Sequence, residues 1–383
     1  MRRLFYQLLT FVLTIVVVIE SERDHQYAHG PFGKAHLSVN LPNPFNCNRT
    51  IGLISRLFPM KSLRLTELQV SKVNYSNADQ LTVTWTPIEN PCKDDFIGVY
   101  FVEVPVTTGA CDYADFEFVT ATQTTSTWTM INLRRQLEFR FYSREKCMGP
   151  YQFIAKSPVV QPSNENEPTQ VHLALGDQND QMYVSYVTNS SAVIPQCQYG
   201  LSPSSLTSTV SGTSTTYNAS NMCEGKANLV GPQNFIHPGY MHTMLMNDLR
   251  PSTTYYYRVG SNEHGWSSIY EFINRQSSKD DTVNLVAYGD MGLSPIQSGA
   301  KRTIDRVFAK AVSTNATAVL HIGDISYARG TGVLWDGFMT QIEPTTSRIA
   351  YMTGIGNHEY DHVTGGQNDP SHAPGPGGFR PTW

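Results

Sequence analysis

The sequence lacks an excess of positive charge and lacks the cysteine spacing of a zinc site. Its 28 lysines and arginines are outnumbered by 32 aspartates and glutamates, which leaves a formal net charge of -4. A basic footprint for nucleic acid is therefore missing, and we expect no nucleic-acid partner. The six cysteines include no Cys-x-x-Cys pair, which argues against structural zinc. With 40% hydrophobic and only 16% charged residues, the chain has the composition of a globular protein rather than a disordered one.

Long apolar runs are also scarce, and the one that stands out lies at the N-terminus. Arg2 and Arg3 precede an almost unbroken apolar run from Leu4 to Ile19, the pattern of a secretory signal. A clean small-residue cleavage site does not follow it. The alternative is an uncleaved signal anchor, for which the run is slightly short. We predict a signal peptide over residues 1–21, a secreted, extracellular protein, and no stable membrane span after signal removal.

An oxidising compartment would explain the six cysteines as disulfides. Spacing alone leaves the connectivity open, and the one local bridge that we predict joins Cys197 to Cys223. Acceptor sequences for N-glycosylation, which would suit surface loops of a secreted chain, occur at Asn48, Asn74, Asn189, Asn218 and Asn315.

Short alternating apolar runs follow the N-terminal segment and predict two all-β units. Residues 81–85, 96–101 and 137–142 alternate with a period of two and are rich in aromatic and β-branched side chains. This pattern predicts an N-terminal β-sandwich-like domain over residues 22–160. The polar stretch 161–168 then reads as a linker.

The second all-β unit is predicted over residues 168–276. Residues 171–175 and 182–187 alternate in the same way. Residues 249–260 place a leucine and a proline before a tyrosine-rich strand, which resembles the fibronectin type III sandwich. We interpret these tyrosines as core and corner packing rather than as a ligand platform.

Strand and helix patterns alternate in the last part of the chain. The strand-like runs are residues 283–288, 318–322 and 349–355, and the segments between them carry helical apolar spacing, as at Ile304, Val307 and Phe308. Such alternation predicts a parallel sheet with crossover helices. The predicted fold class is therefore multidomain, with two β-sandwich units before an α/β segment over residues 282–383.

Each of these three runs ends in a glycine that is followed by a polar residue. The loops at the carboxyl ends of parallel strands meet at one rim of the sheet, where ligands bind. A single such pair is usually only a turn or a helix cap, but three in order favour a shared site. The side chains delivered to the rim are Asp290, Asp324, Tyr327, Asn357 and His358.

These residue types suit a pair of metal ions. A carboxylate such as Asp324 can bridge two ions, and the phenolate of Tyr327 suits a trivalent one. The amide oxygen of Asn357 is neutral and better matched to a divalent ion. Two ions about 3.5–4 Å apart form a clamp for in-line displacement at phosphorus.

The three motifs together resemble those of the purple acid phosphatases, which belong to the binuclear metallophosphoesterases. They read Asp290-x-Gly292, Gly323-Asp324-x-x-Tyr327 and Gly356-Asn357-His358-Glu359. The resemblance is closest to large plant-type members and extends upstream through both β-units. It implies that residues 282–383 are part of a metallophosphoesterase catalytic domain.

The resemblance also implies a ligand set and a reaction. Asp290 and Tyr327 would bind Fe(3+), Asp324 would bridge, and Asn357 would bind a divalent zinc, manganese or iron ion. His358 would position the substrate phosphate or donate a proton to the leaving group. The expected enzyme is an acid phosphatase that hydrolyses phosphomonoesters of small phosphorylated substrates.

The histidine motifs that complete the family site, VxxH and GHxH, do not occur in this sequence. We therefore expect a C-terminally truncated chain that is inactive by itself. Two other functions stay open: a nucleotide pyrophosphatase or phosphodiesterase on the same centre, and an inactive secreted β-sandwich binding protein. Glu359 either orients His358 or is a polar turn residue, and His321 is expected to be a buried, hydrogen-bonded histidine rather than a ligand. The sequence leaves the oligomeric state open.

Overall fold

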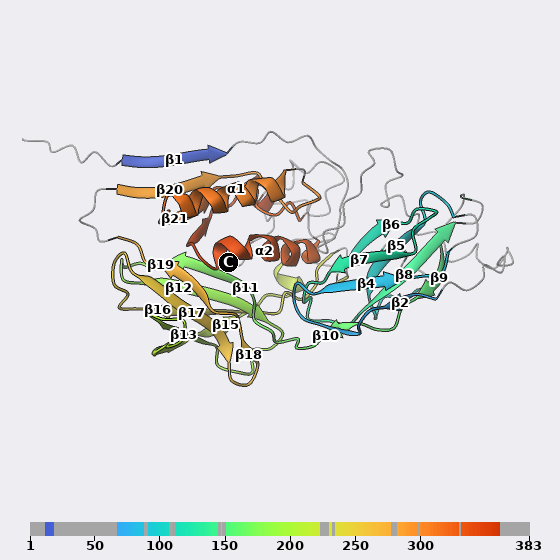
Figure 1. Ribbon diagram of the computed structural model, residues 1–383, viewed down its shortest axis with the longest axis horizontal. Helices are drawn as coiled ribbons and strands as arrows, with labels where there is room; N and C mark the ends of the chain where they lie inside the picture. Colours follow the sequence, from blue (N-terminus) through green and yellow to red (C-terminus); the bar gives the residue numbers. More distant parts are fainter. Residues whose placement is uncertain are drawn as a thin grey trace, which may run out of the picture.

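The computed structural model describes most of the chain after residue 66 and a short segment before it. The described residues are 12–18, 67–87, 91–106, 110, 112–144, 147, 151–222, 230–231, 234–276, 282–297, 299–328 and 331–360. They are mostly β-strand with few helices, and they form two all-β units beside a parallel sheet that carries helices (Figure 1).

The first unit is all-β, as predicted, and its two main sheets share one core. The sheets have the strand orders β2-β4-β7 and β6-β5-β8-β9. The rings of Trp128 and Phe139, one from each sheet, meet edge to face with centroids 5.4 Å apart, and both side chains are fully buried. The strands are β2 (Gln69–Val70), β3 (Asn74–Tyr75), β4 (Gln80–Thr84), β5 (Phe96–Phe101), β6 (Asp115–Phe118), β7 (Thr125–Thr129), β8 (Leu137–Arg144), β9 (Tyr151–Lys156) and β10 (Gln161–Pro162). The predicted linker therefore begins as a strand, because β10 pairs in parallel with β3.

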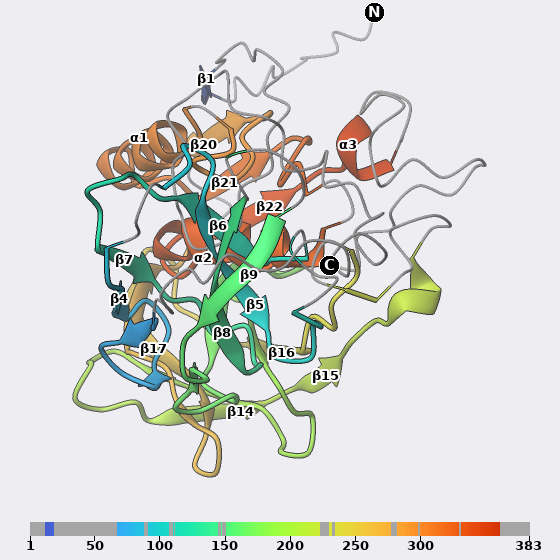
Figure 2. The ribbon, with the colours of Figure 1, turned by 90° about the vertical axis from the view of Figure 1, so that its right-hand side faces the viewer.

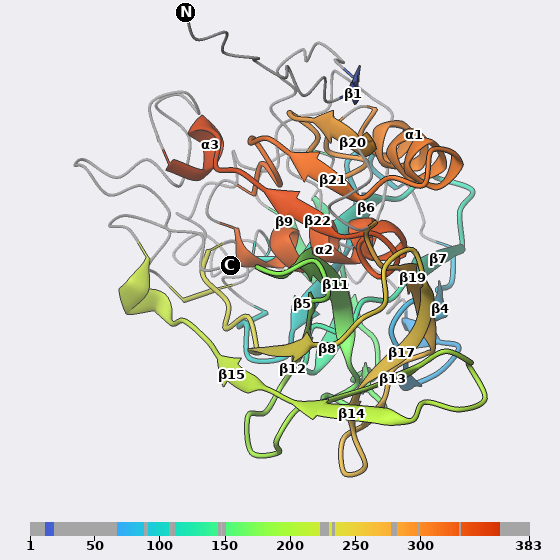
Figure 3. The same cartoon turned by 90° about the vertical axis from the view of Figure 1, so that its left-hand side faces the viewer.

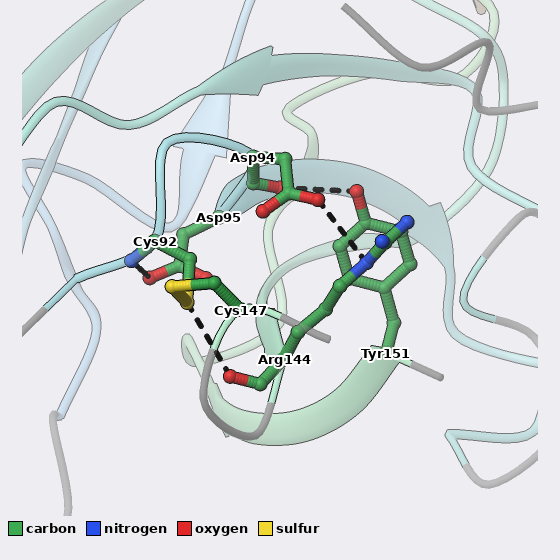
Figure 4. The surroundings of a disulfide bond; sticks show 6 residues. All are labelled: Cys92, Asp94, Asp95, Arg144, Cys147 and Tyr151. Atoms are coloured by element: carbon green, nitrogen blue, oxygen red, sulfur yellow. Dashed lines mark hydrogen bonds and ion pairs between the residues drawn. A yellow bond between two sulfur atoms is a disulfide. The ribbon is translucent and has the colours of Figure 1, made fainter. Parts of the chain in front are cut away.

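A disulfide between Cys92 and Cys147 closes one end of this unit (Figure 4). Beside it, the guanidinium of Arg144 lies 4.4 Å from the centre of the Tyr151 ring and pairs with Asp94 at 3.2 Å. Burial raises the pKa of Asp95, whose carboxylate accepts a hydrogen bond from the Cys92 backbone at 2.9 Å. The sulfur of Cys92 is committed to the disulfide, so the nearby carboxylates do not make a cysteine-containing metal site with it.

The second unit is also all-β, with strand orders β11-β12-β16-β15 and β14-β13-β17-β18, and β19 pairs with β17. The predicted bridge from Cys197 is wrong. Cys197 faces the core between the sheets as a free, fully buried thiol, and Cys223 lies outside the described residues. The strands are β11 (Thr169–Leu175), β12 (Met182–Thr188), β13 (Gln196–Gly200), β14 (Ser208–Ser211), β15 (Thr213–Thr215), β16 (Tyr240–Met246), β17 (Thr254–Ser261), β18 (Gly265–Trp266) and β19 (Tyr270–Ile273).

The α/β part is the parallel sheet that the alternating pattern predicts. Its strands β20 (Thr282–Tyr288), β21 (Ala318–His321) and β22 (Tyr351–Thr353) lie side by side in chain order (Figure 3). The connections are α1 (Ala300–Ser313) and α2 (Gly332–Thr346), and the short α3 (Asn357–Tyr360) follows β22. Val307 and Phe338 from the two helices are fully buried in one cluster with Val319. Both helices therefore cover the same face of the sheet, as crossovers of one hand require.

The N-terminal segment contributes an edge strand to this sheet. β1 (Val12–Val18) pairs in parallel with β20, and its β-branched residues suit a strand. The remaining residues of the predicted signal lie outside the described part, and the signal itself stays a prediction. Within the described ranges, the structure contains no helix with the length and apolar content needed to cross a bilayer.

Helix α2 lies where the three parts of the molecule meet (Figure 1). Asp336 of α2 pairs with Arg134 of the first unit at 2.7 Å and accepts a hydrogen bond from the Gln170 amide at 2.7 Å. About two turns further along α2, the Glu343 carboxylate accepts hydrogen bonds from the Gln170 backbone N–H and from the Tyr270 hydroxyl, each at 3.0 Å. Because these contacts are buried or half-buried, the helix behind the parallel sheet is tied to both β-units.

The predicted glycosylation positions differ in their surroundings. Asn74, Asn218 and Asn315 are exposed, whereas Asn189 is half-buried and its amide donates to Glu165 at 2.8 Å. Asn48 lies outside the described residues. Glycosylation stays a prediction at all five positions.

Candidate metal centre

Three predicted ligands sit at the carboxyl ends of the strands in an unusual backbone conformation. Asp290, Asp324 and Tyr327 have φ values of 56°, 51° and 52°. For residues other than glycine, this left-handed conformation costs on the order of 1–3 kcal/mol each and persists where the surroundings enforce it. Three such residues in two neighbouring loops indicate that the surrounding structure holds the backbone of this rim in the conformation that places these side chains.

The side chains of these three residues converge. The Tyr327 hydroxyl donates to Asp290 Oδ1 and to Asp324 Oδ2, each at 3.3 Å. Asp324 and Tyr327 are buried, whereas Asp290 is exposed at the outer side of the cluster. Two carboxylates therefore lie around one phenolic oxygen, and the cluster is exposed on the side of Asp290.

Glycines allow the loops to approach this closely. A Cβ on Gly356 would lie 2.1 Å from Asp324 Oδ1, and a Cβ on Gly323, whose φ is 130°, would lie 2.8 Å from the Gly356 Cα. Contacts this short leave no room for a side chain. The glycines that precede Asp324 and Asn357 are thus required where the second and third loops touch.

The third motif follows β22 as the short helix α3 (Figure 2), and hydrogen bonds join it to the second motif. The His358 backbone N–H donates to Asp324 Oδ1 at 3.1 Å. The half-buried His358 ring lies against the Tyr327 ring, with centroids 4.3 Å apart and planes inclined by 46°. Asn357 begins α3, and its side chain lies outside the described part. The structure thus brings Asp290, Asp324, Tyr327 and His358 together.

The sequence allows two roles for Glu359, which are to orient His358 or to be a polar turn residue, and the structure shows its contacts. Its carboxylate is 2% exposed and accepts hydrogen bonds from the backbone N–H groups of Asp324, Ile325 and Gly356, at 3.0, 2.8 and 3.0 Å. Burial raises its pKa, and these hydrogen bonds oppose the rise. The hydrogen bond from the Gly356 N–H is half of a capping box. The sequence signal for this motif is a glutamate three residues after the N-cap residue. The other two bonds reach a different loop.

A buried polar layer lies beneath the rim. His321 Nδ1 is 2.7 Å from the Tyr351 hydroxyl, which also contacts the Tyr288 hydroxyl, and the Tyr288 ring stacks on the imidazole at 4.5 Å. Burial lowers the pKa of His321 to about 3, and a contact with the Asp324 backbone opposes this. The expectation that His321 is a buried, hydrogen-bonded histidine is confirmed. Arg329, His362 and His372, which also attract attention in the sequence, lie outside the described residues.

The donor set fits a hard metal ion. Asp290, Asp324 and Tyr327 present carboxylate and phenol oxygens to one another at contact distance, and hard cations prefer oxygen ligands. Asp290, Asp324 and Tyr327 are therefore the residues that would hold such an ion.

Comparisons with known proteins find similarities over much of the chain. A family model described as Purple acid Phosphatase, N-terminal domain, matches residues 168–274. Two Arabidopsis thaliana proteins match further: probable inactive purple acid phosphatase 9 is 28% identical over 341 residues, which are 81% of this chain and 50% of that protein. Probable inactive purple acid phosphatase 1 is 32% identical over 246 residues, 60% of this chain and 39% of that protein. The chain thus spans half or less of the length of these relatives.

A solved structure extends the match to the fold. Purple acid phosphatase PPD1 from yellow lupin (Lupinus luteus) seeds superposes with a TM-score of 0.66, at 23% identity, over 77% of this chain and 57% of that one. At this identity the likeness concerns the fold, and the fibronectin III-like character of the second unit stays a prediction. Over residues 168–274 the chain is similar to the N-terminal domain of the purple acid phosphatases, and over a longer range it is similar to plant members of that family.

Proposed function

We propose that the chain contributes the Asp290, Asp324 and Tyr327 part of a binuclear centre for the hydrolysis of phosphomonoesters. The observation that supports this most directly is the Tyr327 hydroxyl, which donates to both carboxylates at 3.3 Å. Similarity to the purple acid phosphatases supports the reaction class. The specific metals, the substrate and the turnover of this chain belong to the proposal.

In this proposal, Asp290 and Tyr327 would hold a ferric ion, Asp324 would serve both ions, and Asn357 would hold a divalent zinc, manganese or iron ion. When bound, such a pair supplies Lewis acidity and an activated nucleophile at phosphorus. The left-handed loops hold the donors in place before any ligand arrives, so little reorganisation is needed on binding.

His358 is the proton donor of the proposal. Its backbone is fixed by Asp324 Oδ1, and its ring is half-buried against Tyr327. An imidazole in this position can hold a proton and pass it to the leaving-group oxygen of a phosphate bound at the rim. The buried carboxylate of Glu359 keeps that loop against the second motif.

Metal binding and turnover are tested separately. The 383-residue chain is titrated with Fe(3+) and then Zn(2+) or Mn(2+), followed by metal analysis and visible absorption, and assayed with an aryl phosphate at mildly acidic pH. We expect ferric binding with a phenolate-to-iron band and turnover close to background. Absence of stoichiometric iron and of the band would contradict the proposal and favour the binding-protein alternative. Turnover well above background would contradict the expected inactivity of this chain.

A further inference from the structure

We propose that Glu359 is a positioning residue that locks the second and third motifs together and so sets the geometry of the metal ligands. The inference concerns the site of the proposed function, and the part of its test that measures metal affinity rests on that function. The part that measures amide hydrogen exchange rests only on the contacts of the carboxylate.

The two oxygens of Glu359 receive three backbone N–H groups. Oε1 accepts from Ile325 at 2.8 Å, and Oε2 accepts from Asp324 and Gly356, each at 3.0 Å. Among the described residues, Glu359 forms no ion pair with a lysine, arginine or histidine. A buried carboxylate without a cation depends on such N–H donors for its stabilisation.

A helix cap explains only one of the three bonds. The Gly356 N–H belongs to the start of α3, where a glutamate at this position commonly folds back. The N–H groups of Asp324 and Ile325 belong to the loop after β21, which is separated from Glu359 by 35 and 34 residues. These two bonds are not part of the capping of the four-residue helix α3. The carboxylate therefore also joins the second motif to the third.

The contact is reciprocal, which makes it a lock. Glu359 from the third motif holds the Asp324 backbone, and Asp324 Oδ1 from the second motif holds the His358 backbone at 3.1 Å. The glycines at 323 and 356 leave no space between the two loops. A shift of the third motif would therefore move Asp324, and the distance between Asp324 and the Asn357–His358 pair is set at this point.

Glu359→Gln tests the lock, because it keeps the volume and leaves only one acceptor oxygen. Glu343→Gln on α2 is the matched control, since Glu343 also accepts a backbone N–H and a hydroxyl in a half-buried setting away from the rim. Amide hydrogen exchange is measured for Asp324, Ile325 and Gly356 in the 383-residue chain. We expect Glu359→Gln to accelerate exchange at these three amides by about tenfold or more, and Glu343→Gln to leave them unchanged relative to global stability.

Ferric affinity gives the second readout. Loss of a residue that orients a ligand typically lowers metal affinity by about 10–100-fold, and we expect this for Glu359→Gln only. Unchanged local exchange in Glu359→Gln, or an equal effect of Glu343→Gln, overturns the inference. Faster exchange in a chain whose wild type binds no iron supports the lock and contradicts the proposed function.

The wild-type chain provides a measurement for the case in which Glu359→Gln fails to fold. If one carboxylate holds the amides of Asp324, Ile325 and Gly356, the three should open together and show the same protection. Protection that differs widely among them overturns the inference.

Discussion

His172 of β11 donates from Nε2 to the backbone carbonyl oxygen of Tyr351 in β22, at 2.8 Å. The Tyr351 hydroxyl in turn contacts His321 and Tyr288 beneath the rim. Tyr351 therefore connects the second β-unit to the buried polar layer that lies beneath the loops of the candidate metal centre. The β-unit is part of the support of the site, which argues against a sandwich that works as a separate binding module.

Tyr351→Phe tests this support. Among the described residues, the Tyr351 hydroxyl is the one that contacts His321 Nδ1, so the variant leaves a buried ring nitrogen unsatisfied, which costs about 1–3 kcal/mol. We expect the free energy of unfolding in urea to fall by that amount. Tyr186→Phe is the control, because the Tyr186 hydroxyl reaches only Gly260 O at 3.5 Å. Equal losses in the two variants would contradict the special role of Tyr351.

The junction at α2 predicts a second stability effect. The side chains of Arg134 and Asp336 are 3% and 6% exposed, and removal of one partner of a buried ion pair costs about 3–5 kcal/mol. Asp336→Asn should therefore lower the free energy of unfolding substantially. Asp305→Asn, which breaks the exposed pair with Lys301 within α1, should lower it little. A small effect of Asp336→Asn would mean that the units do not unfold together.

Much of the architecture follows from local pattern. The alternation over residues 81–85 predicts β4, whose burial alternates, and the apolar spacing of Ile304, Val307 and Phe308 predicts α1, because each pattern matches the period of its element. Pairing is less visible. β10 consists of a glutamine and a proline and is a strand only because β3 lies beside it. Cys92 and Cys147 are 55 residues apart, and only the folded sheet brings them together.

The site divides in the same way. Asp290, Asp324 and Tyr327 are predictable because a glycine and a strand end precede each loop, and parallel strands bring such loops to one rim. The role of Glu359 is not predictable in this way. Two of its three backbone N–H donors lie in another loop, and that loop comes close only where Gly323 meets Gly356. Sequence proximity predicts a bridge from Cys197 to Cys223, but the position of Cys197 in β13 places its thiol in the core.

His242 predicts a loss of stability in acid. Burial lowers its pKa to about 4, and repulsion from His264 adds to this, whereas an unfolded histidine titrates near a pKa of about 6.5. Between these values the unfolded state binds a proton that the folded state does not, so the free energy of unfolding falls as pH decreases through this window.

Unfolding measured from pH 7 to pH 4 checks this prediction. His242→Gln should flatten the decrease. Ser214→Ala removes a hydroxyl that lies 2.7 Å from the imidazole but leaves the ring to titrate, so it should lower stability while keeping the slope. An unchanged slope in His242→Gln would assign the acid sensitivity to other groups.

The disulfide predicts a redox-dependent stability. Its loop of 55 residues corresponds to about 4 kcal/mol of chain entropy in the unfolded state. The double variant Cys92→Ala and Cys147→Ala should lose a comparable part of the free energy of unfolding, and a reductant should destabilise the wild type more than this variant. Equal sensitivity of both proteins to the reductant would contradict the prediction.

Tyr327→Phe separates the metal ligand from the packing of the rim. The variant keeps the ring that lies against His358 at 4.3 Å and removes only the oxygen that joins Asp290 to Asp324. We expect the visible band on ferric addition to disappear, because a phenolate bound to iron produces it. Tyr186→Phe, in the second β-unit, should retain the band. Persistence of the band in Tyr327→Phe would place the ferric ion on a different phenol and would remove Tyr327 from the ligand set.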